Sequence, residues 1–499
     1  MSIFRVVLFA GRKISMNNSN RIFRYTREDM PLAIFEDISA IPRASGKEER
    51  ISEYLLNRAL ERGLEASRDE TNNVIIKKKA SPGYEDCEPV MLQAHMDMVC
   101  EKLPDSEHDF DKDPIHLIVD GDILHADGTT LGADDGIGVA LAMAVLESDD
   151  IKHPPIEVLF TTEEESTFLG VASVDGAMFE AHRVINLDFA EEERVVVGSC
   201  GGTGMKVRLL IQREEIVKEN GKAWEISITG MHGGHSGEDI DKGYGSANQL
   251  MTRVLRQLLR QFDIGLVSIK GGTSRLAISR DCRAVVLTYA DLLPTLKKMH
   301  QIFMHEYGEV CPDLDISVRE VEAKGLKYSG DTFDRIMTLL TLFPDGIMQM
   351  NGSFANIVES SINMGIIDER DGQFYIEAEI RGAYGSTVID IAEKVAHLVE
   401  VKGGTWEKFD GYAPWTYNPD SEMRTKAMEV YKKMYGREMT PVVLHAGLEC
   451  GFLGDVIPNM DAISIGPDSR SFHSPNECLS ISSTKRVWNY LKELLAELG

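Results

Sequence analysis

The chain has 499 residues, more than one ordinary hydrophobic core can organise, so its length predicts two or more domains. Its formal net charge is −27 at pH 7, and so acidic a surface argues against nucleic acid or an anionic membrane as a partner. No apolar run approaches the roughly 18 residues that a membrane-spanning helix requires.

The seven cysteines are an odd number and form no CxxC motif, which favours reduced thiols in an intracellular, cytoplasmic protein. The first residues, MSIFRVVLFAGRKIS, contain an apolar core too short for a secretion signal, with Arg12 and Lys13 directly after it. We therefore interpret residues 1–21 as an N-terminal extension. Either Met1 or Met16 is the true start.

Strand and helix patterns alternate through the N-terminal part of the chain. Apolar residues at helical spacing predict helices over 28–41 and from about 48 to 62. A glycine-rich turn around Gly132 and Gly136 opens an apolar helix over 137–146, and it lacks the sequence of a phosphate-binding loop. Short apolar runs predict buried strands at 73–78, 89–99, 156–160 and 184–187. This alternation predicts a largely parallel sheet.

Polar residues follow the predicted strands where each strand ends. His95 and Asp97 are two residues apart, so their side chains would point the same way in a strand. A carboxylate is the usual partner for the second ring nitrogen of a metal-binding histidine, although the pattern also fits a core histidine beside an incidental aspartate. Because parallel sheets place functional residues at the carboxyl ends of their strands, we expect this pair to lie near Asp134, Glu164, Glu165, Asp188 and His473.

Two imidazoles and several carboxylates form a mixed nitrogen and oxygen ligand set. Such a set suits zinc, manganese or cobalt, and the absence of cysteine from it argues against a structural zinc site. Without cations, this many carboxylates in one cleft would raise each other's pKa. Five ligands suit two ions about 3.5–4 Å apart.

The character of the sequence changes after Cys200. Half-exposed strands and a strong amphipathic helix over 248–262 indicate an α+β domain inserted into the first one. The first pattern returns at Gly404, and an amphipathic helix closes the chain. We predict an α/β catalytic domain, with a mostly parallel twisted sheet flanked by helices, divided between 22–204 and 404–499. Residues 205–403 would form the inserted α+β domain, a lid or dimerisation domain, and a homodimer is left open.

Seven segments resemble, in order, the aminoacyl-histidine dipeptidases, also called Xaa-His or cytosol non-specific dipeptidases, of the zinc aminoacylase and carboxypeptidase clan. The segments are QAHMDMV, GTTLGADDGIG, TTEEESTFLG, INLDFAEEE, GGHSGEDI, HAGLECG and IGPDSRSFHSPNE. They extend over nearly the whole chain from about Met30. Each segment is weak alone, whereas their common order is highly specific.

The resemblance implies a role for each residue of the cluster. His95 would bind one metal ion and His473 the other. Asp134 would bridge the two ions, and Glu165 and Asp188 would complete the two ligand sets. Asp97 would orient His95, and the Asp134–Asp135 peptide bond would be cis. The cofactor would be two divalent ions, zinc first, with cobalt or manganese as alternatives.

The resemblance also implies that Glu164 is the general base. It would take a proton from a metal-bridged water, the hydroxide would attack the peptide carbonyl, and the carboxyl would return the proton to the leaving amine. In an extended segment, adjacent Glu164 and Glu165 would point to different sides. Since Glu163 precedes them, the assignment depends on the alignment of Thr161 and Gly170.

Three further residues match motifs that contact substrate. His235 in GGHSG resembles an oxyanion-stabilising histidine, and Arg381 in EIRGAYGS resembles an arginine that binds the free carboxylate of the substrate. Without the resemblance, a loop histidine and a surface ion pair would be favoured. Glu449 in HAGLECG would lie near the amino end of the substrate, and a structural role fits it equally well. Leu276 and Ser279 depart from the asparagine and proline expected in that family.

These observations predict a di-metal dipeptidase that hydrolyses unblocked dipeptides, with Xaa-His as one substrate class. Its partner would be a small peptide, with no nucleic acid and no membrane. A tripeptidase or N-acyl amino acid deacylase of the same clan is the first alternative. A non-catalytic metal-binding protein is the second, and the presence of Glu164 argues against it.

Overall fold

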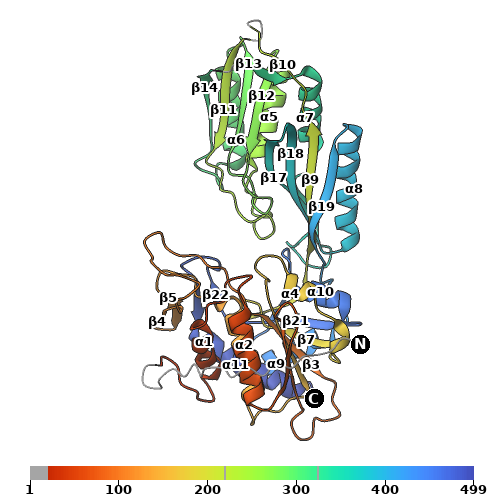
Figure 1. The fold of residues 1–499 in the computed structure, drawn as a ribbon. Coiled ribbons are helices and arrows are strands. Elements are labelled where there is room, and N and C mark those ends of the chain that lie inside the picture. Colours follow the sequence, from red (N-terminus) through yellow and green to blue (C-terminus); the bar gives the residue numbers. More distant parts are fainter. Residues whose placement is uncertain (1–20, 218–220, 323–324) are drawn as a thin grey trace.

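The computed structural model describes residues 21–217, 221–322 and 325–499, so the predicted extension at 1–21 lies, except for its last residue, outside the described residues. Two parts of the molecule each contain their own sheet (Figure 1). The part with both the N-terminal and the C-terminal elements carries the first sheet, and the middle of the chain forms the second. None of the helices in the described ranges combines the length and the apolar character that crossing a membrane requires.

The first sheet has eight strands in the order β1–β2–β6–β3–β7–β21–β8–β20. They are β1 (Glu65–Arg68), β2 (Val74–Lys78), β3 (Val90–His95), β6 (Ile156–Thr161), β7 (Arg183–Asn186), β8 (Arg194–Ser199), β20 (Thr440–Leu444) and β21 (Asp461–Ser464). The central strands β6, β3, β7 and β21 are parallel, and β1 and β2 extend one edge in antiparallel pairing. The predicted mostly parallel sheet is confirmed.

Helices cover both faces of this sheet because its strands are apolar on both sides. In β3, Val90 and Leu92 belong to a core with α1, α3, α9 and α11, whereas Met91 lies in a second core with α4 and α10. Alternate residues of a strand point to opposite faces, which explains the continuous apolar runs in the sequence. The helical elements are α1 (Met30–Ser39), α2 (Glu49–Glu61), α3 (Ala133–Glu147), α4 (Leu169–Ala172), η1 (Gly176–Met178), α9 (Glu422–Tyr435), α10 (Glu449–Val456) and α11 (Ile481–Glu497).

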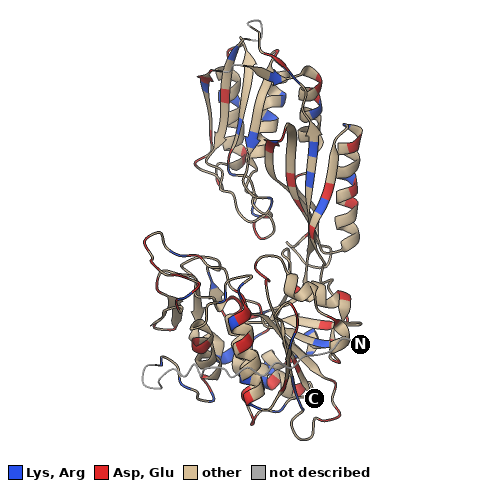
Figure 2. Cartoon of the chain, viewed as in Figure 1, with Lys and Arg blue, Asp and Glu red and all other residues tan. Residues whose placement is uncertain are grey.

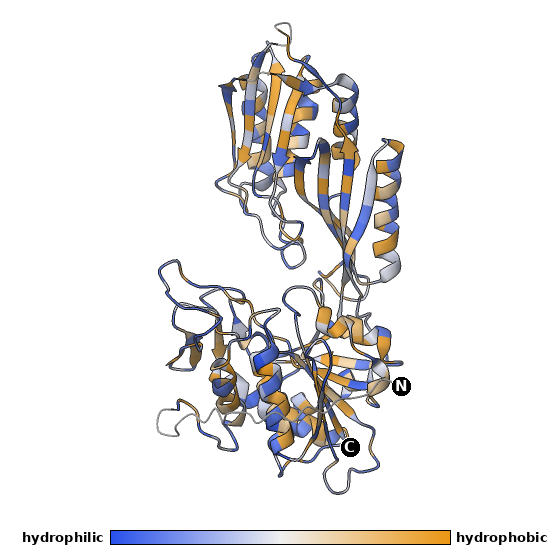
Figure 3. Ribbon diagram, viewed as in Figure 1, coloured by the Kyte–Doolittle hydropathy of each residue, from blue (hydrophilic) through white to orange (hydrophobic). Residues whose placement is uncertain are grey.

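The second sheet is antiparallel, in the order β14–β11–β13–β12–β17–β18–β9–β19, with β16 paired to β17. Its strands are β9 (Gly201–Leu210), β11 (Lys222–Thr229), β12 (Gly265–Gly271), β13 (Cys282–Thr288), β14 (Asp315–Val321), β16 (Gly346–Met350), β17 (Val358–Arg370), β18 (Gln373–Gly382) and β19 (Thr405–Tyr412). Helices α5 (Ala247–Leu259), α6 (Leu293–Tyr307), α7 (Gly330–Leu342) and α8 (Gly385–Val401) share one hydrophobic core with these strands. The strands alternate hydrophobic and hydrophilic residues (Figure 3), as expected for a sheet covered on one face.

Two small sheets complete the fold. One pairs β10 (Arg213–Glu215) with β15 (Leu326–Tyr328), and the other joins β4 (Leu117–Asp120), β5 (Ile123–Ala126), β22 (Ser469–Arg470) and β23 (Cys478–Ser480). Acidic and basic residues are interspersed on helices of both parts of the molecule (Figure 2).

The chain crosses between the two parts at two adjacent points. β8 continues into β9 between Ser199 and Gly201, and β19 returns to the first part after Tyr412. Ser199 forms a backbone bridge to Trp415 beside this return. β19 lies after the predicted boundary at 404, yet it pairs with β9 in the second sheet. This pairing supports a boundary after Tyr412, and the division into domains itself remains a prediction.

Candidate metal centre and substrate site

The polar residues predicted at strand ends gather at one edge of the first sheet. The strands β6, β3 and β7 are parallel neighbours, so their carboxyl ends meet there. His95 ends β3, and Asp134 lies in the turn that opens α3. Glu164 and Glu165 follow β6, Asp188 follows β7, and His473 lies between β22 and β23.

Asp134 lies between the two histidines of this cluster. Its Oδ1 is 3.1 Å from Nε2 of His95, and its Oδ2 is 3.3 Å from Nε2 of His473. The Asp134–Asp135 peptide bond is cis, as predicted. Each oxygen of Asp134 therefore faces a different histidine, which is the arrangement that a bridging ligand requires.

Each histidine has a second carboxylate of its own. Oδ1 of Asp188 is 3.9 Å from Nε2 of His95, and Oε2 of Glu165 is 3.0 Å from Nε2 of His473. We call these the His95 side and the His473 side of the centre, with Asp134 shared between them. Within the described ranges, two sets have ligand atoms that all lie within 4.8 Å of one another: His95, Asp134 and Glu165, and His95, Asp135 and Asp188.

The carboxylates of the cluster are buried together with little positive charge. Burial, followed by the charges of neighbouring carboxylates, raises the pKa of Glu164 and of Asp188 well above the ordinary values. Hydrogen bonds to Asp134 and Glu165 raise the pKa of His473 to about 10. Two divalent cations would remove the repulsion among the carboxylates and bind both imidazoles, so this donor set fits the implied ions.

Asp97 connects His95 to the segment that carries the two glutamates. Its Oδ1 is 3.3 Å from Nδ1 of His95, so the predicted contact is present. Its two oxygens also accept the backbone N–H groups of Glu164 and Glu165, each at 3.1 Å. Burial alone would raise the pKa of Asp97, but the hydrogen bonds from His95 and Ser45 lower it below its ordinary value. Asp97 therefore stays ionised and fixes both segments.

The glutamate segment, which follows the predicted strand, is a turn and is not extended. Glu163 has a φ of 53°, and its carbonyl accepts the N–H groups of Thr167 and Phe168 at 3.0 and 2.8 Å. The turn, and not strand alternation, separates the side chains of Glu164 and Glu165. The Glu163 carboxylate accepts a hydrogen bond from Thr167 Oγ1 at 2.8 Å. Glu163 is therefore engaged at the exposed rim of the turn, which supports the assignment of Glu164 as the base.

His235 and Arg381 lie together in the second part of the molecule. Nη2 of Arg381 is 3.4 Å from Nε2 of His235, and Nη1 donates to Tyr412 Oη at 2.6 Å. Arg381 is only 4% exposed and its Nε has no hydrogen-bond partner, so the alternative role in a surface ion pair does not fit it. Burial, followed by the charge of Arg381, lowers the pKa of His235 to about 4. His235 is therefore neutral at pH 7.

His445 joins this second group and was not predicted. Its Nε2 is 2.7 Å from Ser361 Oγ, and burial followed by the charge of Arg381 lowers its pKa to about 3. A Cβ at Gly237 would lie 2.4 Å from His445 O and 3.2 Å from both Arg381 Nε and His235 Cε1. Only glycine leaves this space free. The sequence could have identified His445, because it is the first residue of HAGLECG, one of the segments that resemble the family.

A cavity of about 520 Å³ lies between the two groups. Its lining includes Asp134 and Asp188 from the metal centre and Gly237 and His445 from the second group. This volume lies within the range of small-molecule sites. The cavity can therefore hold a small ligand in contact with both groups.

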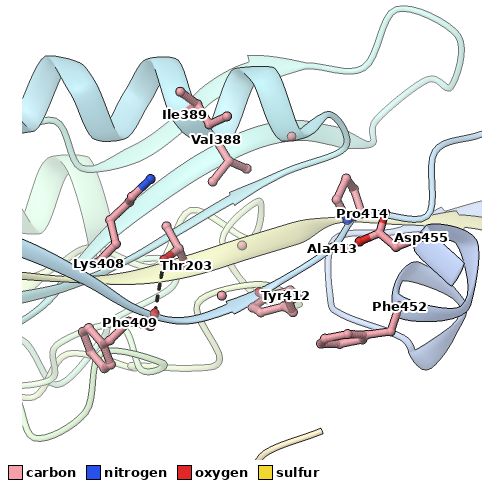
Figure 4. Close-up of a pocket in the computed structure, with 13 residues that line it drawn as sticks. Thr203, Val388, Ile389, Lys408, Phe409, Tyr412, Ala413, Pro414, Phe452 and Asp455 are labelled. Carbon is pink, nitrogen blue, oxygen red and sulfur yellow. Dashed lines mark hydrogen bonds between the residues drawn. The ribbon is translucent and has the colours of Figure 1, made fainter. Parts of the chain in front are cut away.

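A second cavity, of about 510 Å³, lies where the two parts join (Figure 4). Val388 of α8, Tyr412 of β19 and Phe452 of α10 surround it. The described residues that line it include no histidine or cysteine, and Lys408 and Asp455 are the charged ones. The ligand set for cations thus belongs to the first cavity.

Glu449 lies beneath the metal centre and does not reach the cavity. It is 0% exposed, and its Oε2 accepts hydrogen bonds from Thr161 Oγ1, at 2.7 Å, and from Gln93 Nε2. Asn186 Nδ2 donates to Gln93 Oε1 at 2.6 Å. These buried hydrogen bonds favour the structural role for Glu449 that the sequence left open beside contact with the amino end of the substrate. Glu449 is the first residue of α10, and because the first turn of this helix is buried, its side chain bonds to residues of β3 and β6 below the site.

Thr167, where many members of that family have glycine, lies in the turn of Glu163. The other departures, Leu276 and Ser279, lie in the segment that bonds to Gly234 and Ser236. Ser279 Oγ accepts the backbone N–H of Asn248 at 3.1 Å, at the start of α5. The carbonyl of Leu276 accepts the N–H of Ser236 at 2.8 Å, and the Leu276 side chain is exposed. Ser279 thus has a structural role that proline, without a hydroxyl, would lack.

Comparisons with known proteins agree with this geometry. A sequence model of peptidase family M20/M25/M40 matches residues 91–497. The cytosol non-specific dipeptidase of Escherichia coli (strain K12) is 36% identical over 472 residues, which cover 93% of this chain and 96% of that protein. The crystal structure of aminoacylhistidine dipeptidase from Vibrio alginolyticus is 34% identical, with a TM-score of 0.84 over 94% of this chain and 98% of that one. Aminopeptidase PepT from Bacillus cereus, 14% identical with a TM-score of 0.53 over 95% of this chain and 99% of that one, shares the fold.

Proposed function

This chain belongs to peptidase family M20/M25/M40 and is a metallopeptidase, and from that premise we propose that it hydrolyses unblocked dipeptides. The observation that supports this most directly is one small cavity lined by Asp134 and Asp188 of the metal centre and by His445 and Gly237, and Gly237 packs against His235 and Arg381. The similarity to two proteins named as dipeptidases supports dipeptides as the substrate class.

We propose that the centre holds two divalent cations. His95 and Asp188 would hold one, His473 and Glu165 the other, and Asp134 both. When bound, the ions would polarise the peptide carbonyl and lower the pKa of water. Zinc is the first choice because imidazole and carboxylate together suit it, with cobalt or manganese as alternatives.

Glu164 is proposed to move the proton. Its carboxylate accepts a proton from the attacking water and later donates it to the nitrogen of the leaving amine. The hydrogen bond from the Glu164 N–H to Asp97 supports this role, because it fixes the segment next to His95. Asp97 is the positioning residue for both.

His235 and Arg381 are proposed to bind the substrate. Nδ1 of His235 accepts the backbone N–H groups of Gly237 and Glu238 at 3.4 and 3.2 Å, so the proton of the neutral ring is proposed to lie on Nε2 once Arg381 Nη2, now 3.4 Å from Nε2, turns to the substrate. Nε2–H can then donate to the oxyanion that forms at the peptide carbonyl. The Arg381 guanidinium, with its Nε free, would bind the terminal carboxylate in a bidentate manner.

The relatives also suggest a substrate class and a location in the cell. Xaa-His dipeptides are proposed as one substrate class because of the name aminoacylhistidine dipeptidase. A cytoplasmic location is proposed because of the name cytosol non-specific dipeptidase. Homodimerisation remains a prediction.

A substrate panel with metal analysis tests the proposal. Purified protein would be assayed with Ala-Ala, Ala-His, a tripeptide and an N-acetyl amino acid, before and after chelation. We expect two bound ions per chain, hydrolysis of the dipeptides, loss of activity with chelator and recovery with zinc or cobalt. Faster hydrolysis of the tripeptide or the N-acetyl amino acid would support the alternative of the same clan. Two bound ions without hydrolysis of any compound would indicate a metal-binding protein.

A further inference from the structure

Glu477 is a buried carboxylate beside the metal centre, and both of its oxygens accept backbone N–H groups. It follows His473 in the segment SFHSPNE and is only 2% exposed. Its Oε2 accepts the N–H groups of Leu131 and Gly132 at 2.8 and 2.9 Å, and its Oε1 accepts those of Ala133 and Asp134 at 2.8 and 3.2 Å. One side chain thus holds the consecutive amides of the turn that carries Asp134.

This arrangement requires a carboxylate. Each carboxylate oxygen can accept two hydrogen bonds, whereas a glutamine side chain has one oxygen and one NH₂ group. At position 477, a glutamine would place its NH₂ group against two backbone N–H groups. Amides at the start of a helix have no partner within the helix, so the turn before α3 depends on an acceptor from outside.

Arg43 contacts the same turn from another direction. It is 2% exposed and donates to the carbonyl oxygen of Gly132 and to those of Met96 and Asp97, the latter two at 3.0 and 2.8 Å. A Cβ at Gly132 would lie 2.5 Å from Arg43 Nη2, which shows how closely the turn and the guanidinium pack. Gly132 is therefore bonded through its N–H to Glu477 and through its carbonyl to Arg43.

We infer that Glu477 and Arg43 are positioning residues that set the separation of the metal ligands. Glu477 fixes the segment of His473 against the turn of Asp134, and so determines the His473 side. Arg43 fixes the end of β3 against the same turn, and so determines the His95 side. The inference rests on the proposed function, because it presupposes the paired cations. Arg43 also lies before residue 91, where the match to the family begins.

The two residues should have different effects on cation binding. We expect Glu477→Gln to weaken binding at the His473 side about 10–100-fold and to leave the His95 side near its wild-type affinity, as is typical when a partner of metal ligands is lost. Arg43→Lys should weaken the His95 side by a similar factor, since a lysine cannot reach three carbonyl oxygens in the planar geometry of arginine.

Glu157→Gln is the matched control. Glu157 is 4% exposed and also accepts two backbone N–H groups, those of Glu180 and Ala181, both at 3.0 Å. It lies near the start of β6, at the end of the strand away from the metal centre. Its loss should lower the melting temperature without changing cation affinity.

The test is a cobalt titration of the full-length, metal-free protein, followed by visible absorption and calorimetry. A His473→Ala variant identifies the absorption band of the His473 side. We expect two binding steps in the wild type, one selectively weakened step in Glu477→Gln, and a wild-type titration in Glu157→Gln. Glu477→Asp, which keeps the charge but shortens the side chain, should fall between them and provides a second variant if the glutamine variant does not fold.

The outcomes separate the inference from the proposed function. Wild-type affinity at both steps in Glu477→Gln, together with a melting temperature lowered as in Glu157→Gln, would overturn the inference and leave a purely structural role. Fewer than two cobalt ions in the wild-type protein would overturn the paired centre itself. Equal weakening of both steps by Glu477→Gln would contradict the division into two sides.

Discussion

The two groups beside the cavity of about 520 Å³ differ in their buried charge: carboxylates are in excess in the first, and a positive guanidinium is in excess in the second. At the edge of the first sheet, burial and neighbouring carboxylates raise the pKa of Glu164 and of Asp188. At the base of the second sheet, burial and Arg381 lower the pKa of His235 and of His445. These imbalances support the proposal that the first group binds cations and the second binds an anion. An uncompensated buried charge, more than the residue types, indicates which ligand each group binds.

Removal of the cations should have the largest effect, because it leaves the carboxylates of the first group to repel one another. We expect dialysis against a chelator to abolish hydrolysis and to lower the melting temperature, since ions that bind only the folded state stabilise it. Activity, metal content and melting would be measured before dialysis, after it and after re-addition of zinc. Full activity in metal-free protein would contradict the proposal that the first group binds cations needed for hydrolysis.

Glu164→Gln should lower kcat by about 10²–10⁴-fold, because the carboxyl that moves the proton is lost while the ligands remain. The bound metal should stay at the wild-type level. Glu163→Gln is the control, since Glu163 bonds to Thr167 at the rim of the turn, and it should retain near wild-type activity. A greater loss in Glu163→Gln than in Glu164→Gln would shift the base assignment by one residue.

Arg381→Lys tests the second group. The variant keeps the positive charge but loses the fork that binds a carboxylate, so we expect KM to rise about 10–100-fold, the value of a charged hydrogen bond, with kcat little changed. Arg370→Lys, on the exposed end of β17, should leave both constants unchanged. The effect should also be smaller for a substrate with an amidated C-terminus. Equal losses for the free and amidated substrates would refute carboxylate binding by Arg381.

The lowered pKa of His235 predicts a pH dependence of stability. Its pKa is about 4 in the folded protein and 6.5 in the unfolded chain, so the unfolded state binds the proton first as the pH falls. The free energy of unfolding therefore contains the full contribution of the neutral histidine above pH 6.5, and it decreases by about 2 kcal/mol by about pH 5. His235→Gln should remove that decrease, measured by urea unfolding at about pH 7 and 5. An unchanged slope with pH would refute the neutral histidine.

Tyr412→Phe should have the smallest effect. Tyr412 Oη accepts a hydrogen bond from Arg381 Nη1 at 2.6 Å and donates to Glu379 Oε1 at 3.2 Å. Loss of this support costs about 1 kcal/mol, or about fivefold in KM, because Arg381 becomes less well oriented. Steady-state kinetics with a dipeptide would measure it, with Tyr375→Phe, which bonds to Glu377, as the control. A change in kcat alone would show that Tyr412 does not contribute to binding of the substrate carboxylate.

Much of the metal centre could be predicted because its residues follow buried strands. The apolar runs before His95, Glu164 and Asp188 predicted three parallel strands, and their carboxyl ends meet as expected. Asp134 and His473 were also expected at strand ends, but neither residue follows a strand of this sheet: Asp134 lies in the turn that opens α3, and His473 lies between β22 and β23.

Other features could not be predicted because they depend on contacts remote in sequence. Glu449 begins a helix, and its local pattern does not say whether that helix starts at the cavity or beneath the sheet. Glu163 has a positive φ, which glutamate rarely adopts, so its residue type did not indicate this backbone conformation. β19 is an edge strand that is largely exposed on both faces, so its sequence did not show that it belongs to the second sheet. Gly403 and Gly404 before it indicated a domain boundary at that point.

The position of β21 between β7 and β8 has a consequence for the order in which the protein forms. During translation the second sheet, whose strands all lie between Gly201 and Tyr412, leaves the ribosome complete, while the first sheet still lacks its inner strand β21 and its edge strand β20. Domains generally fold as they emerge, so we expect the middle of the chain to become ordered before its ends. A nascent chain released before residues 461–477 would leave a gap in its sheet and could not assemble the paired-ion centre.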